Sequence, residues 1–165
     1  MSNTPSQFSS LHCESCVLSK AHRSPFTSVR EHATSPLQLV HSDLCGPLPM
    51  SLGKNIYFAT FIDDYSRFCW VYLLQRKDAA TIASVFHKWI TYAENESGMK
   101  VKSLRTDGGG EYQKELQQIL QSRGIRHQTT TPYSPQSNGI AERMNRSLNE
   151  AVRAMLFEAH MPQEW

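Results

Sequence analysis

The stretch IYFATFIDDYSRFCWVYLL (residues 56–74) contains two runs of aromatic and β-branched residues separated by DDYSR. Runs of this composition bounded by Asp and Ser are typical of β-strands. We therefore predict that IYFATFI (56–62) and FCWVYLL (68–74) form an antiparallel pair. One more strand is predicted before them in LQLVHSD (37–43), because a Gly-Pro pair follows it. The first half of the domain thus indicates an antiparallel sheet.

The apolar periodicity changes after this region. In DAATIASVFHKWITYAENESG the apolar residues recur at helical spacing, which predicts a helix over 78–98 that ends at Gly98. The remaining elements are predicted to be a strand (101–106), a helix (111–124), a strand (125–131) and a last helix that carries Glu142. Strands that alternate with helices run parallel through right-handed crossovers. We predict an α/β fold with a mixed five-stranded sheet, three antiparallel strands and then two parallel ones, flanked by helices.

Composition sets limits on the class of protein. The chain has 165 residues and 39% hydrophobic content, which is enough for one globular domain with a core. The net charge of +2, without a long run of like charge, permits an anionic partner but does not argue for one. The sequence has neither an apolar signal core nor an apolar run of membrane-spanning length. We therefore expect no membrane association and a nuclear or cytoplasmic location.

Two carboxylates stand where predicted strands end. Asp43 ends the first strand and Asp107 follows the fourth, and both precede Gly-containing turns. In open α/β sheets the carboxyl ends of strands are where sites form. Each Asp taken alone is more often a solvated turn residue or a cap. If the first and fourth strands are neighbours, the helix with Glu142 crosses near both. Three clustered carboxylates then need a cation or raised pKa values, and Mg²⁺ suits an all-oxygen site.

The last predicted helix has two different sides. Polar residues share the side that carries Glu142: Asn145, Arg146, Asn149 and Arg153. Apolar residues gather on the opposite side: Ile140, Met144, Leu148, Ala151 and Met155. A polar stripe is usually a solvated face, although amide and guanidinium groups also contact phosphates and base edges. Leu156 breaks the pattern, which indicates that the end of the helix packs differently.

Four motifs, in the order HSDLCGP, FIDDYSR, RTDGGGEY and YSPQSNGIAERMNR, resemble the integrase catalytic core of a copia-type LTR retrotransposon. The resemblance runs from Cys13 to Trp165, and the 35-residue separation of Asp107 and Glu142 fits the D,D,E triad of that family. It implies an RNase H-like fold and a DDE-type polynucleotidyl transferase or endonuclease. It also implies that Asp43, Asp107 and Glu142 are the catalytic, metal-binding residues.

The resemblance also implies the reaction and the partners. Two Mg²⁺ or Mn²⁺ ions, bridged by Asp43, would serve 3′-end processing and then strand transfer into target DNA. The partners would be the DNA ends of the element and the target DNA, with a homo-oligomer in the full-length integrase. The candidate DNA contacts lie on the last helix and the loop before it: Gln136, Asn138, Arg143, Asn145 and Arg146.

The N-terminal region is predicted to lie outside the catalytic core. Residues 1–10 are rich in Ser, Thr and Pro and are expected to be disordered. Residues 11–33 resemble the end of a zinc-binding pre-integrase segment with a linker, and 34–165 a C-terminally truncated core, as in a fragment of a Pol polyprotein. Cys13 and Cys16 form only an incomplete zinc site, since a structural zinc needs four ligands. We expect no zinc in this fragment.

Other interpretations stay open. Turn chemistry explains Asp63 and Asp64, the helix dipole explains Glu111, and His41 is interpreted as a packing residue. A related RNase H-fold nuclease would share the carboxylates but lack the SPQSNGIAER loop. A catalytically silent, retroelement-derived nucleic-acid-binding module would keep the fold without turnover. A purely structural interaction protein is the third alternative, which tight metal binding would exclude.

Overall fold

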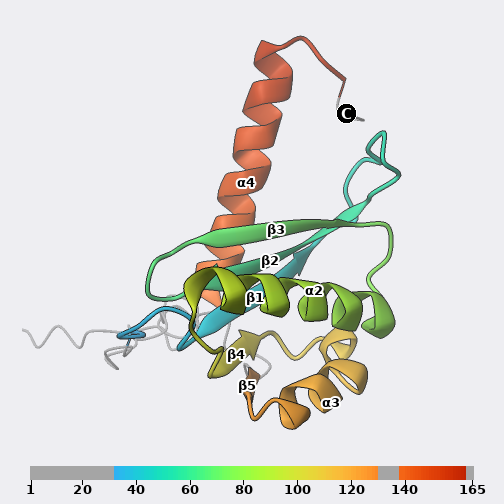
Figure 1. The fold of residues 1–165 in the computed structure, drawn as a ribbon. Helices are drawn as coiled ribbons and strands as arrows, with labels where there is room; N and C mark the ends of the chain where they lie inside the picture. Colours follow the sequence, from blue (N-terminus) through green and yellow to red (C-terminus); the bar gives the residue numbers. More distant parts are fainter. Residues whose placement is uncertain (1–31, 130–137, 163–165) are drawn as a thin grey trace, which may run out of the picture. The chain divides into compact units, whose positions relative to one another are not determined.

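A computed structural model describes residues 32–129 and 138–162, which lie within one compact unit. The elements follow the predicted order (Figure 1): β1 Val40–Cys45, β2 Tyr57–Asp63, β3 Cys69–Leu74, α2 Ala79–Ser97, β4 Ser103–Thr106, the 3₁₀ helix η1 Gly110–Tyr112, α3 Glu115–Ser122, β5 Arg126–Thr129 and α4 Gly139–Glu158. Among the described residues no helix is long and apolar enough to cross a membrane.

The five strands form one mixed sheet in the order β3-β2-β1-β4-β5. β1 pairs with β2 and β2 with β3 in antiparallel fashion, whereas β1 pairs with β4 and β4 with β5 in parallel. The prediction of three antiparallel strands followed by two parallel ones is confirmed. Because β1 and β4 are parallel neighbours, their carboxyl ends point toward the same edge of the sheet.

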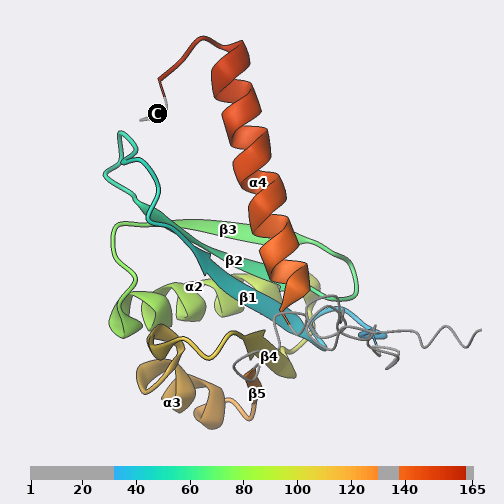
Figure 2. The same cartoon turned by 180° about the vertical axis from the view of Figure 1, so that it is seen from behind.

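Helices cover both faces of this sheet. α2 and α3 lie on one face and α4 on the other, as Figures 1 and 2 show from opposite sides. Alternation along β2 serves both layers: Phe61 stacks on Trp89 of α2 at 4.4 Å between ring centroids, and the next residue, Ile62, packs with Ile140 and Ala141 of α4. Side chains two residues apart on a strand share a face, so one strand supplies both cores.

Local signals explain the boundaries of α2. The Asp78 carboxylate accepts a hydrogen bond from the Thr81 amide at 2.9 Å, which caps the first turn. Gly98 ends the helix at φ 66°, a left-handed conformation that glycine adopts without a Cβ penalty. The predicted helix over 78–98 is confirmed, with Ile82, Phe86, Trp89 and Ile90 all buried.

The single helix predicted over 111–124 is wrong. The chain forms η1, breaks at Lys114 with φ 52°, and only then begins α3. The cause is Tyr112, which is 1% exposed and shares a hydrogen bond of 3.3 Å between its hydroxyl and Ser42 Oγ on β1. Placing this ring in the core interrupts the helical path.

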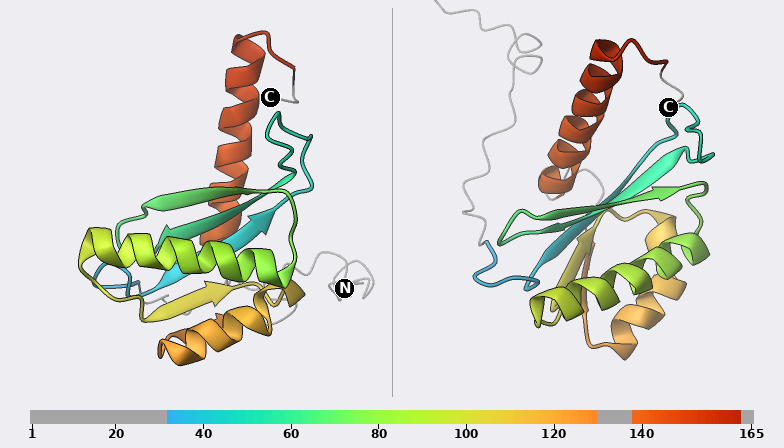
Figure 3. Two further views of the ribbon diagram at one scale, coloured as in Figure 1. Left: turned by 45° about the vertical axis from the view of Figure 1, so that its right-hand side comes forward. Right: turned by 45° about the horizontal axis from the view of Figure 1, so that its top comes forward.

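α4 buries only residues of its first turns, and further along Asn149 Nδ2 donates to Cys45 Sγ on β1 at 3.1 Å. The buried residues of α4 are Gly139, Ile140, Ala141 and Asn145. The prediction that one apolar side continues along the helix is wrong for Ala151 and Met155, which are exposed. Figure 3 shows α4 rising away from the sheet along its length, which leaves these two side chains open to solvent.

Some predictions fall on parts of the chain that the structure does not describe. Cys13, Cys16 and Gln136 lie outside the described residues. The domain boundaries proposed at residues 10, 33 and 34 therefore stay predictions.

Candidate functional site

Asp43 lies on the central strand and is held by α4. Asn145 Nδ2 donates a hydrogen bond to Asp43 Oδ2 at 2.9 Å, and Thr60 Oγ1 donates to Asn145 Oδ1 at 2.9 Å. Burial, followed by the nearby charge of Asp107 and then a smaller effect of Glu142, raises the pKa of Asp43 to about 6, against hydrogen bonds from Leu44 and Asn145 that lower it. The fold therefore brings the charges of all three predicted residues within range of one another.

Asp107 follows β4 in a turn that gathers a further carboxylate. Its Oδ1 accepts a hydrogen bond from the Gly109 amide at 3.2 Å, and its side chain is exposed. A Cβ at Gly109 would lie 2.8 Å from Oε2 of Glu111 and 3.1 Å from Oδ1 of Asp107. The two carboxylates thus flank the same glycine. The helix-dipole interpretation of Glu111 missed this approach, which the run of glycines before it makes sterically possible.

Glu142 lies in the first turn of α4. Its amide donates to the Asn138 carbonyl at 3.2 Å, and its side chain is exposed. In the part of the chain that the structure describes, no three His, Cys, Asp or Glu side chains are already close enough to hold one metal ion together. What links the three predicted residues is charge, since Asp107 and Glu142 each act on Asp43.

The chemistry of this cluster fits a divalent cation. All the acidic side chains offer oxygen, which Mg²⁺ prefers. Burial and then the charges of Asp43, Asp107 and Glu111 raise the pKa of Tyr112 well above its usual range, while its hydrogen bond with Ser42 acts in the opposite direction. The charges of Asp43, Asp107 and Glu111 thus gather near this edge of the sheet. A bound cation would offset the repulsion that raises the pKa of Asp43.

Comparison with known proteins decides the family. The Integrase core domain family matches residues 33–135, more than half of the chain. The chain belongs to this family. Its members are polynucleotidyl transferases that generally use divalent metal ions.

This integrase core matches a part of each of several longer proteins. It is 47% identical over 155 residues to the Retrovirus-related Pol polyprotein from transposon TNT 1-94 of Nicotiana tabacum, covering 93% of this chain and 12% of the relative. It is 29% identical over 155 residues to the corresponding polyprotein from transposon RE2 of Arabidopsis thaliana, covering 94% of this chain and 10% of the relative. The integrase core thus spans about an eighth or less of these curated relatives.

A solved structure shares the fold. The chain resembles a protein in the simian T-cell lymphotropic virus intasome in complex with PP2A regulatory subunit B56 gamma, with a TM-score of 0.71 and 21% identity. The match covers 87% of this chain and 49% of the other. At this identity the likeness supports the fold alone, and it agrees with the RNase H-like architecture that the motifs imply.

The candidate DNA contacts of the integrase core divide into two groups. Asn138 is 2% exposed and donates from Nδ2 to the Ser42 carbonyl at 3.2 Å. Asn145 is 5% exposed and already bonded to Asp43 and Thr60. Burial of these two amides argues against direct contact with DNA and gives them a positioning role. Arg143 and Arg146 are exposed on the first turns of the same helix, where phosphates can reach them.

Asp63 and Asp64 serve the scaffold of the integrase core. Asp63 accepts hydrogen bonds from the Ser66 amide at 2.9 Å and hydroxyl at 2.6 Å, as turn chemistry predicts. Asp64 does more, because it accepts from the Ala33 amide at 2.7 Å and bonds His41 Nε2 at 3.1 Å. Burial alone would raise the pKa of Asp64, but these hydrogen bonds hold it below its usual value. This buried carboxylate ties residue 33 to the sheet.

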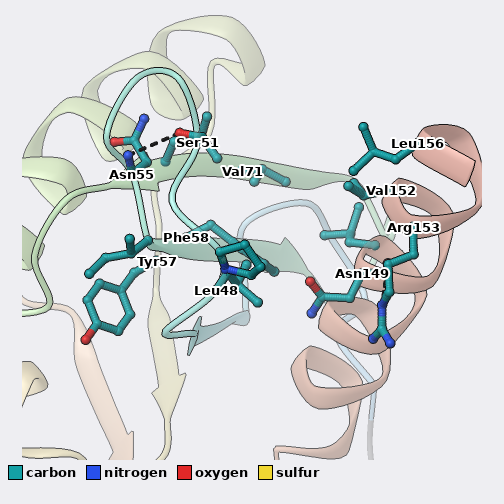
Figure 4. A pocket seen from close by; sticks show the side chains of 14 residues that line it. Leu48, Ser51, Asn55, Tyr57, Phe58, Val71, Asn149, Val152, Arg153 and Leu156 are labelled. Carbon is teal, nitrogen blue, oxygen red and sulfur yellow. Dashed lines mark hydrogen bonds between the residues drawn. The ribbon is translucent and has the colours of Figure 1, made fainter. Parts of the chain in front are cut away.

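An apolar groove lies away from the carboxylates. Its volume is about 570 Å³, and it runs between the later turns of α4, the β2–β3 hairpin and the loop after β1 (Figure 4). Leu73, Val152 and Leu156 are among its lining residues, with Asn149 and Arg153 on the helix side. The groove has no acidic lining residue, so it is separate from the candidate metal centre.

Proposed function

We propose that this chain is the catalytic core of a retrotransposon integrase that performs metal-dependent 3′-end processing and DNA strand transfer within a longer polyprotein. The observation that carries the proposal is the placement of Asp43 on the central strand, where Asn145 of α4 holds its carboxylate and the charges of Asp107 and Glu142 both act on it. Family membership supports the reaction class. Element ends and target DNA are the proposed substrates, and a homo-oligomer is the proposed working form.

Asp43, Asp107 and Glu142 would hold two Mg²⁺ or Mn²⁺ ions, with Asp43 as the shared ligand. When bound, such ions activate the attacking oxygen and stabilise the leaving oxygen at phosphorus. Asn145 keeps the Asp43 carboxylate in one orientation, because the Thr60 hydroxyl in turn fixes the amide. The Gly109 amide does the same for Asp107.

Exposed arginines on α4 would bind the phosphates of DNA. Arg143 and Arg146 follow Glu142 within about one turn, so a phosphate bound by them lies near the carboxylates. Guanidinium groups bind phosphate in bidentate geometry and stay charged at every relevant pH. These contacts fix the backbone of DNA without reading its sequence. No covalent enzyme intermediate is required, because the attacking oxygen belongs to water or to the DNA 3′ end.

The test is resolution of a labelled, preassembled branched oligonucleotide by purified protein in Mn²⁺. A branched substrate supplies geometry that other parts of a full-length integrase would impose, and positioning contributes much of the rate in such reactions. Asp107→Asn should abolish resolution while DNA binding is kept, because the change removes no phosphate contact. Glu150→Gln, an exposed acid on the later turns of α4, is the matched control and should keep full activity.

Binding is measured on the same proteins. Arg146→Ala should weaken DNA binding across all sequences and reduce the slope of log affinity against log salt by roughly one unit, as expected for one lost phosphate contact. If wild type and Asp107→Asn bind DNA equally and neither resolves the branch, the catalytic proposal fails. The nucleic-acid-binding module would then be the better description.

A further inference from the structure

A hydrogen-bonded pair of side chains lies beneath Asp107, between the last two strands of the sheet. Thr106 is fully buried at the end of β4, and its Oγ1 is 3.0 Å from Nε2 of His127 on β5. The same hydroxyl donates to the backbone carbonyl of Asp107 at 2.7 Å. His127 is half-buried, and nothing in the proposed function uses it.

The direction of these hydrogen bonds follows from the number of protons. A threonine hydroxyl carries one proton, and the shorter contact of 2.7 Å directs it to the Asp107 carbonyl. Thr106 Oγ1 must then accept at its other side, so His127 donates from Nε2. The hydrogen bonds thus run in series from the His127 imidazole N–H to the Thr106 hydroxyl and on to the Asp107 carbonyl. Burial lowers the pKa of His127, which favours a neutral ring. The acceptor role of Thr106 Oγ1 then places the one ring proton on Nε2.

We propose that His127 is a positioning residue of the metal centre, which acts through the Thr106 hydroxyl to fix the peptide after Asp107 and thereby the direction of the Asp107 carboxylate. This inference rests on the proposed function. The Gly109 amide holds the carboxylate of Asp107 from the other side, at 3.2 Å. Asp107 is thus fixed at its carbonyl and at its side chain, although the side chain itself is exposed to solvent.

Such partners beyond the ligands typically change metal affinity by roughly 10–100-fold when removed. A carboxylate on a turn has many orientations, and each one that faces away from Asp43 weakens binding of a shared ion. Fixing the peptide after Asp107 removes these alternatives before the ion arrives. The effect should appear in metal affinity and in turnover, whereas affinity for DNA should stay unchanged because no phosphate contact is altered.

Paired substitutions separate this role from simple packing. Thr106→Val keeps the shape and removes the hydroxyl, whereas Thr106→Ser keeps the hydroxyl. His127→Leu removes the donor, whereas His127→Gln offers an amide N–H at the end of a side chain of similar reach. The matched control is Gln128→Leu, which breaks the bonds that Arg105 makes to Gln128 at 3.0 and 2.6 Å between the same two strands.

The first measurement is Mn²⁺ affinity by calorimetry, using the metal alone. Thr106→Val and His127→Leu should raise the half-saturating Mn²⁺ concentration at least tenfold. Thr106→Ser, His127→Gln and Gln128→Leu should stay within about threefold of wild type. The second measurement is the tautomer of His127 by ¹⁵N NMR, which needs no metal and should show the proton on Nε2. Its resonance should shift in Thr106→Val.

A proton on Nδ1 of His127 in wild type would overturn the inference, as would an unchanged Mn²⁺ affinity in Thr106→Val. Equal losses in Thr106→Val and Thr106→Ser would also overturn it, because packing would then be the cause. A wild-type protein that binds no Mn²⁺ would defeat the proposed function. The tautomer and its response to Thr106→Val would still decide whether the hydrogen-bonded chain exists.

Discussion

The two halves of α4 differ in almost every physical respect. Residues 139–148 lie against β1 and β2, and they include the helix residues that are buried. In residues 149–158 Asn149 still donates to Cys45 Sγ of β1 at 3.1 Å, whereas Met155 and Phe157 are 63% and 82% exposed. The first half carries Glu142, Arg143, Asn145 and Arg146, which are all candidates for the site. The second half borders the apolar groove.

This difference shows how a surface helix can present a carboxylate with precision. The first half is fixed by Ile140 and Ala141 against Ile62, and by the hydrogen bond from Asn145 to Asp43. Glu142 projects from that fixed segment, so its position depends on the sheet and not on the later turns. The helix is therefore a rigid support at one end and an extended surface at the other.

The largest expected effect is on the pH dependence of stability, through the Asp43 carboxylate that the first half of α4 helps to bury. The pKa of Asp43 in the folded protein is about 6, above the usual value of an aspartate, so the folded state favours the protonated acid. Its contribution to stability is full below about pH 4 and is lost as pH rises through about 6. In metal-free protein, Asp43→Asn should therefore gain about 2–3 kcal/mol over wild type between pH 4 and pH 8.

Urea unfolding in EDTA at both pH values measures this gain, with Glu150→Gln on the exposed half of α4 as the control. Glu150→Gln should change stability by less than about 0.5 kcal/mol at either pH. A constant difference between Asp43→Asn and wild type across this range would mean that the carboxylates do not interact as the structure indicates.

A second effect, of similar size, is expected from Ile140, the apolar anchor of the first half. Ile140 is 9% exposed and packs with Ile62, so Ile140→Ala should cost about 2–3 kcal/mol in unfolding free energy. Met155→Ala removes a side chain of similar size from the second half and should cost no more than about 0.5 kcal/mol, since that side chain is mostly exposed. Thermal and urea unfolding measure both. Similar losses for the two variants would erase the distinction between the halves.

The smallest effect is expected at the groove. Val152 is 47% exposed and lines it, so Val152→Ala loses little burial and gains helix propensity. The two changes should offset each other to within about 0.5 kcal/mol. Activity on branched DNA should be unchanged, because the groove has no acidic lining residue. Loss of activity without loss of stability would show that the groove takes part in the reaction, which would contradict its separation from the candidate metal centre.

Local patterns were enough to predict the sheet and most of the helices. Alternation and turn residues placed β1, β2 and β3, and the change of period placed α2. The helix over 111–124 could not be predicted correctly, because Tyr112 leaves the helical path to reach Ser42, which is 70 residues earlier in the chain. A contact over that distance leaves no trace in a local pattern.

The site was predictable in its acids but less so in their partners. Strand ends and motif spacing selected Asp43, Asp107 and Glu142, whose metal-binding role stays a proposal. Helix periodicity placed Asn145 on a solvated stripe, whereas it lies buried against Asp43 and Thr60. A polar side chain that is buried because it bonds to a distant strand cannot be recognised from the sequence until that strand is known to be its neighbour. Glu111 was missed for the same reason, since its approach to Asp107 depends on the turn at Gly109.

The hydrogen bond from Asn145 to Asp43 spans 102 residues of sequence, which bears on how the protein is made. At synthesis rates of about 5–20 residues per second, Asp43 would leave the ribosome roughly 5–20 s before the amide that orients it. The antiparallel strands can pair in that interval, but the Asp43 carboxylate cannot be oriented until Asn145 of α4 has been made. Ribosome-bound chains that stop before residue 145 should accordingly lack protection of Asp43 from carboxylate-labelling reagents. Pairing of the antiparallel strands can thus precede the assembly of the acidic side chains by that interval.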